Sequence, residues 1–88
     1  MALDEAARQL KSAAHDAQVA FDCLGLGDLE RAQIHAITAR TAADAAEAVL
    51  REALSRMPAG DAEIEGEQAV LDAEGGSSDE SVIASSAG

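Results

Sequence analysis

Small and apolar residues recur along the first part of the chain in two series. The first series has steps of four and three and comprises Leu3, Ala7, Leu10, Ala14, Ala17, Phe21 and Leu24. The second series has steps of three and four and comprises Leu29, Ala32, Ala36, Ala39, Ala43, Ala46 and Leu50. Such steps mark one face of an amphipathic helix. The pattern therefore predicts an all-α protein with helices over about residues 2–24 and 29–57.

The two series match each other when the chain folds back on itself. The paired residue numbers sum to 53, which places Phe21 against Ala32 and Leu10 against Ala43. An antiparallel helical hairpin with a coiled-coil-like seam requires this kind of pairing. Because most of the paired residues are alanines, we expect the helix axes to lie at the close end of the usual spacing of about 8–10 Å.

The turn between the two series, residues 25–28, has the residues of a helix end followed by a helix start. A helix that stops before Gly25 would hold this glycine in the left-handed conformation and fold Leu26 back onto Phe21, as in a Schellman ending. Asp28 would then accept N–H groups of the second helix, which begins at Leu29.

The second helix is longer than the first and extends past it at the open end of the hairpin. Leu54 and Met57 continue its apolar stripe with no residue of the first helix opposite them. Residues 58–60, Pro-Ala-Gly, then form a helix breaker. Two ion pairs at favourable i,i+4 spacing are expected on its solvated face: Glu47 with Arg51 and Glu52 with Arg56.

A second apolar stripe lies roughly 160° around the second helix from the seam, at about 100° per residue. An isolated hairpin helix should be polar on that side, so the stripe predicts a partner-binding surface. Together with the overhang and an apolar pair near the C-terminus, the predicted partner-binding residues are Ile34, Ile37, Thr41, Ala48, Leu54, Met57, Val82 and Ile83. The alternative is that residues 61–74 fold back and cover the stripe.

The C-terminal third of the chain has a weaker pattern. Residues 61–74 can form a short third helix capped by Asp61, although Gly66 lies in its middle. From Gly75 onward the chain is rich in glycine, serine and alanine, which is typical of a flexible tail. Val82 and Ile83 are an apolar anchor within residues 75–88 that could dock on a partner.

The 88 residues make at most one small domain with one aromatic side chain. A domain of about 60 residues buries only about 60% of its unfolded surface. With a seam made mostly of alanine, an isolated hairpin should be marginally stable. We therefore expect another chain to complete the core, either a protein partner or a second copy in a homo-oligomer such as a dimeric four-helix bundle.

The formal net charge of -11 is unevenly distributed. Residues 1–57 hold nine acids and six bases, whereas residues 58–88 hold eight acids and no base. Direct nucleic-acid binding and attachment to an anionic membrane are therefore not expected. The single cysteine, the lack of a signal-peptide pattern and the lack of a membrane-spanning run predict a cytoplasmic address, with virion assembly or signal-less secretion as alternatives.

The sequence predicts no catalytic, cofactor or metal site. His15, His35 and Cys23 are the soft metal ligands, and neither histidine lies on the predicted seam, so the three cannot converge in one chain. Residues 25–27, Gly-Leu-Gly, lack the strand and the third glycine of a nucleotide-binding loop. Cys23 has no basic neighbour that would activate its thiol. We expect a protein that is not an enzyme.

A two-helix hairpin of about this length looks like the small secreted helical-hairpin proteins of the WXG100 type. Their defining Trp-x-Gly is absent here, because residues 24–27 read Leu-Gly-Leu-Gly and the chain has no tryptophan. We assign no family. The sequence favours an adaptor or small assembly subunit. The alternatives are an acidic inhibitor that mimics nucleic acid toward a basic protein, and a small virion structural protein or signal-less secreted hairpin.

Overall fold

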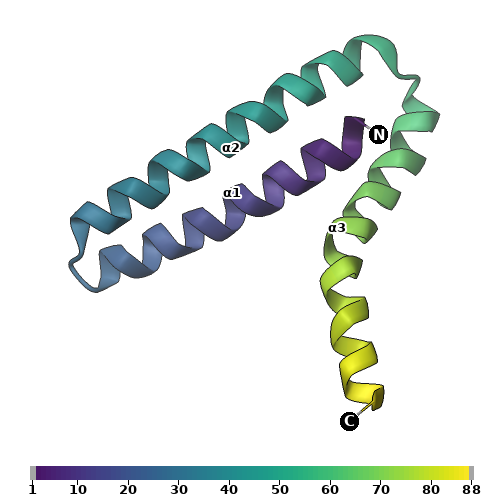
Figure 1. Ribbon diagram of the computed structural model, residues 1–88. Coiled ribbons are helices and arrows are strands. Elements are labelled where there is room, and N and C mark those ends of the chain that lie inside the picture. The colour runs from purple at the N-terminus through teal and green to yellow at the C-terminus, as the bar shows by residue number, and fades with distance from the viewer. Residues whose placement is uncertain (1, 88) are drawn as a thin grey trace.

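The described residues form three α-helices (Figure 1). The computed structural model describes the backbone of residues 2–87 and the side chains of residues 2–75. Helix α1 spans Ala2–Gly25, α2 spans Leu29–Arg56 and α3 spans Ala59–Ala87. The all-helical fold predicted from the sequence is confirmed. Helices α1 and α2 run antiparallel side by side, and α3 leaves from their open end and packs against the N-terminal part of α1.

The three helices lie in a single layer. The Cα atoms extend over 45 × 43 × 14 Å. The three helices lie beside one another, and none of them crosses over another (Figure 1). Helix α1 lies between α2 and α3 in this layer (Figure 1). Among the described residues, the helices therefore form a flat plate, and no second layer of helices covers either face.

The turn between α1 and α2 is a Schellman motif centred on Gly27. The Asp28 N–H donates to the Cys23 carbonyl at 2.9 Å, and the Gly27 N–H donates to the Leu24 carbonyl at 3.0 Å. Gly27 is the C′ residue of this motif and has the positive φ of 76° that the motif requires at this position. The expectation for Gly25 was wrong, because Gly25 is still part of α1 and the left-handed residue lies two positions later.

Asp28 joins the two helices of the hairpin. Its N–H closes the Schellman motif, and its Oδ1 accepts the Arg31 N–H at 3.1 Å as the N-cap of α2. Its carbonyl accepts the Ala32 N–H at 3.0 Å. The left-handed residue at Gly27 places Asp28 directly at the start of α2. Leu26 consequently projects from the turn and is 84% exposed, instead of folding back onto Phe21.

The seam between α1 and α2 consists of small residues. The buried residues of the hairpin are Leu3, Ala6, Cys23, Ala42, Ala46 and Ala53, and Ala46 is fully buried. Beyond Leu3, the buried positions on α1 lie one residue before the predicted ones: Ala6 is buried in place of Ala7, and Cys23 in place of Leu24. A shift of one residue turns a helix face by about 100°. Small side chains in the seam allow the two backbones to approach closely.

The bulky residues predicted for the seam lie on the surface instead. They are Leu10, Phe21, Leu24, Leu29 and Leu50, all of them exposed. Phe21 is 71% exposed. These side chains would hold the helix axes apart if they lay between the helices, whereas the alanine row does not. The predicted seam is therefore corrected at these positions, and only Leu3 among its large residues is buried.

A polar contact crosses the seam midway along the hairpin. The His35 Nδ1 lies 3.2 Å from the Asp16 Oδ1, and both side chains are largely buried. His35 was expected off the seam and level with Gln18, so its position is a second correction. The rotated seam explains the contact, because it brings the Asp16 side of α1 to face α2.

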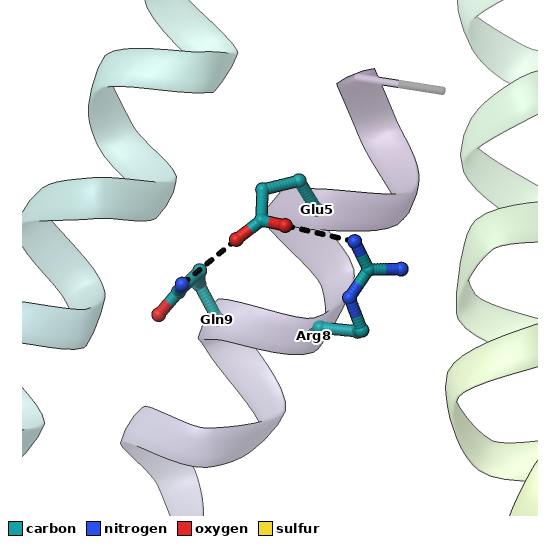
Figure 2. A network of polar contacts seen from close by, with 3 residues as sticks. All are labelled: Glu5, Arg8 and Gln9. Carbon is teal, nitrogen blue, oxygen red and sulfur yellow. Dashed lines mark hydrogen bonds and ion pairs between the residues drawn. The ribbon is translucent and has the colours of Figure 1, made fainter.

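Polar contacts also organise the exposed surface. Figure 2 shows Glu5 accepting hydrogen bonds from Arg8 and from Gln9, each at 2.8 Å. The Gln9 hydrogen bond, followed by the hydrogen bond and charge of Arg8, lowers the pKa of Glu5 from its ordinary value of 4.5. This contribution to stability is present above that value and is lost as the pH falls through the lowered pKa. The two predicted pairs occur, with Glu47–Arg51 at 2.8 Å and Glu52–Arg56 at 3.7 Å.

Helix α3 begins earlier and extends further than the sequence predicted. The break between α2 and α3 is confined to Met57 and Pro58, because proline forces the preceding residue into the extended conformation that Met57 adopts. The Pro58 carbonyl accepts the Ala62 N–H at 2.9 Å and starts α3. Residues 59–60 are thus helical, and the helix continues past Gly75, where a flexible tail was expected.

Small residues on α3 allow it to pack against α1. Ala69 is buried in a cluster with Leu3 and Ala53, and a Cβ added at Gly66 would lie 4.0 Å from the Leu3 Cδ1. The Lys11 Nζ donates to the Ala73 carbonyl at 2.8 Å and lies 3.7 Å from a Glu74 carboxylate oxygen. Gly66 therefore lies at the contact of α3 with α1 and does not interrupt the helix.

The turn geometry predicts opposite outcomes for two glycine substitutions. Gly27→Ala should destabilise the fold by about 1–2 kcal/mol, because a residue with a Cβ pays that cost in the left-handed conformation. Gly25→Ala should be neutral or stabilising by up to about 1 kcal/mol, because Gly25 is helical and a Cβ there meets nothing within 4 Å. Urea unfolding of both variants measures the difference, and the reverse ranking would show that Gly25 ends α1.

We predict that a larger side chain lowers the stability of the fold at a seam position of α2 but not at an exposed position of the same helix. Ala42→Leu should destabilise the fold by about 1–3 kcal/mol, because Ala42 is buried between α1 and α2. The matched control Ala45→Leu lies three residues away on α2, is exposed and should change stability by less than about 0.5 kcal/mol. Thermal unfolding followed by circular dichroism compares them. Equal stability of the two variants would contradict the small-residue seam.

Candidate protein-binding face

The open end of the hairpin carries an apolar hollow that is larger than a second one at the turn end. This hollow has a volume of about 890 Å³ and lies where α1, the end of α2 and the start of α3 meet. The large apolar residues among those lining it are Leu3, Leu10, Leu50, Leu54, Met57 and Val70. Leu54 is 86% exposed, so the end of α2 that extends past α1 contributes an almost uncovered side chain.

A second hollow lies at the turn end of the hairpin. It has a volume of about 550 Å³, and its lining residues are Ala17, Ala20, Phe21, Leu24, Ala32, Ala36 and Ala39. Phe21 and Leu24 supply its large side chains, and the alanines of both helices supply its floor. No charged residue lines it.

Both hollows lie on one side of the hairpin. Most of their lining residues on α1 and α2 belong to the two series of the sequence pattern, and members of one such series share one face of a helix. The mirrored pattern thus describes a surface of the plate beside the seam. We define the apolar face by its large residues Leu3, Leu10, Phe21, Leu24, Leu50 and Leu54.

The apolar face carries little charge. Glu47 and Arg51 are the charged residues lining the two hollows, and they pair with each other at 2.8 Å. The opposite side of α1 is polar. At about 100° per residue it carries the exposed residues Arg8, Ser12, His15 and Asp22. The two sides of the plate therefore differ in their affinity for water.

The isoleucine stripe predicted to bind a partner lies elsewhere, on the side of α2 roughly opposite the apolar face. Ile34 is 54% exposed and Ile37 is 47% exposed, and Thr41 and Ala48 are exposed as well. Because α3 packs against α1, it does not cover this stripe, and the fold-back alternative is wrong. Leu54 and Met57 line the larger hollow, so the structure does not bring them together with the stripe.

Three further predictions concern residues away from these surfaces. Val82 and Ile83 lie outside the residues whose side chains the structure describes. Cys23 has a buried free thiol, and its backbone carbonyl accepts a hydrogen bond of the Schellman motif. Among the described residues, no group of three or more His, Cys, Asp or Glu side chains is placed to hold a metal ion. Within the same residues, no helix has the length and apolar character needed to span a bilayer.

Sequence reasoning missed that the large residues of the mirrored series form a surface. A second signal was present one position earlier, in the small residues Ala6, Ala13 and Ala20, which are spaced seven apart on α1. Of these two adjacent rows, the small one packs against α2 and the bulky one remains open. Comparison with known proteins found no match to a family model, to a curated protein or to a solved structure.

Proposed function

We propose that this protein is a non-catalytic helical interaction module, an adaptor or small assembly subunit, whose apolar face is covered by another polypeptide chain. The single-layer architecture is the main support for this proposal. Among the residues whose side chains are described, no large side chain is fully buried. A plate of this kind buries small side chains and Leu3 but leaves most of its leucines on the surface.

The dimensions of the chain support the same proposal. Its radius of gyration is 16.0 Å, whereas a compact domain of 88 residues has about 12 Å. Exposed contiguous apolar patches on proteins commonly mark protein–protein contact sites. Full burial of a Leu or Phe side chain contributes about 1.5–3 kcal/mol. Covering the apolar face would thus contribute on the order of 10 kcal/mol per chain before the cost of association.

The acidic inhibitor that mimics nucleic acid is retained as a second candidate because of one observation. Helix α3 holds its carboxylates on a regular frame, whereas a flexible segment would not. At about 100° per residue these carboxylates lie on two opposite sides of α3, with Asp61, Glu65 and Asp72 on one side and Glu63, Glu67 and Glu74 on the other. A small virion protein or a secreted hairpin would use the apolar face in the same way as an adaptor.

Affinity capture tests the interaction module. The tagged full chain should retain a partner from an extract of its source, with the untagged chain itself counted as a partner. Leu24→Glu combined with Leu54→Glu should reduce capture at least about tenfold, because two apolar contacts become charged. The matched control, Ile34→Glu combined with Ile37→Glu, should capture normally. Loss of capture in the control alone would show that the binding site is the isoleucine stripe.

Salt dependence separates the two candidate functions. Burial of apolar surface should survive a rise from about 0.15 M to 1 M salt, which shortens the Debye length from about 8 Å to about 3 Å. Replacing Glu63, Glu67 and Glu74 by glutamine should also leave capture unchanged. A mimic of nucleic acid should instead lose its partner under both treatments, because its carboxylates would supply the attraction.

A further inference from the structure

We infer that the chain that covers the apolar face is a second copy of this protein, packed face to face and antiparallel about a two-fold axis. This inference rests on the proposed function and names its partner. The two hairpins then form a four-helix bundle in which each α1 crosses over the α1 of the other copy, and each α2 lies over the other α2.

The distribution of large and small residues on the face is self-complementary. Bulky residues lie at both ends, with Leu3, Leu10 and Leu50 near the open end and Phe21 and Leu24 near the turn. The middle is alanine. An antiparallel two-fold places the turn end of one copy over the larger hollow of the other, and the alanines of both copies meet at the centre. One axis generates both end contacts.

The register follows from the helix rise of about 1.5 Å per residue. Ala14 lies seven residues from both Ala7 and Phe21. A two-fold axis that passes near Ala14 therefore has Ala7 about 10 Å to one side of it and Phe21 about 10 Å to the other. Phe21 of one copy is then level with Ala7 of the second copy. Ala7 and Leu10 line the larger hollow, which therefore receives the phenyl ring.

Charge favours the antiparallel arrangement over a parallel one. Residues 58–88 carry eight acids and no base, and α3 leaves from the open end of the hairpin (Figure 1). In a parallel pair both acidic segments would lie at the same end and repel each other. In an antiparallel pair the two acidic segments begin at opposite ends of the hairpins, separated by about 40 Å, the length of α2 and several times the Debye length of about 8 Å at physiological salt.

The surface area is sufficient for a stable dimer. The chain exposes 6264 Å², whereas a folded monomer of 8.9 kDa exposes about 4,800 Å². One side of the hairpin is about 40 Å long and, for two adjacent helices, about 20 Å wide, so it presents about 800 Å². A standard interface buries about 800 Å² per partner. Face-to-face pairing can therefore bury what a stable interface needs and leave α3 exposed.

Sedimentation equilibrium of the purified full chain tests the inference. We expect a dimer, and we expect Phe21→Asp to raise its dissociation constant at least about 30-fold, the effect of losing a hot-spot aromatic residue. Ile34→Asp, on the other side of α2, should leave the dimer intact. A helical monomer at all concentrations would overturn the second copy as partner, while partner capture would still test the proposed function separately. A dimer sensitive only to Ile34→Asp would overturn the choice of face.

Disulfide trapping tests the register even if Phe21→Asp fails to fold. In a Cys23→Ala background, Ala14→Cys lies at the axis and should give a covalent dimer under mild oxidation. Ala7→Cys should remain unlinked, because its symmetry mate is about 20 Å away and a disulfide requires Cα atoms within about 7 Å. Ala48→Cys, an exposed residue outside the face, measures random collision. Equal linkage at all three sites would overturn the antiparallel arrangement.

Discussion

The structure depends on the close packing of small residues where α1 meets α2. Ala46 is fully buried there, and Ala6 and Ala42 lie in the same seam. Small side chains allow close approach of the backbones, but they bury little apolar area per residue. The same choice leaves Leu10, Phe21 and Leu24 beside the seam and not within it. A thin seam and an open apolar face are thus two results of one packing arrangement.

Helices α1 and α2 could be predicted from the sequence because the spacing of apolar residues and the Met57–Pro58 break specify them locally. The face that each helix presents could not be predicted in the same way. Neighbouring rows on α1, one with Ala6 and Ala13 and one with Leu10 and Phe21, are equally regular and differ by about 60°. The prediction that the bulky row forms the contact between α1 and α2 assumes a core that is covered by a second layer of helices. One layer of helices favours the small row.

Two other differences arise from contacts that spacing does not encode. Gly25 and Gly27 are equivalent by propensity, and the hydrogen bonds of Asp28 determine which of them becomes left-handed. Gly66 weakens a helix considered alone, yet α3 continues through it at the point where it lies beside Leu3 of α1. The candidate binding face was likewise visible in the sequence as a pattern, but its exposure depended on how the helices packed.

Asp28 has a consequence for how the hairpin forms. Its N–H completes the hydrogen bonding at the end of α1, and its carboxylate completes that at the start of α2. Fraying of the two helix ends at the turn is therefore a single event, because neither end can open without loss of the same residue. Nucleation is the costly step of helix formation. One shared residue thus fixes the last turn of α1 and the first turn of α2 together.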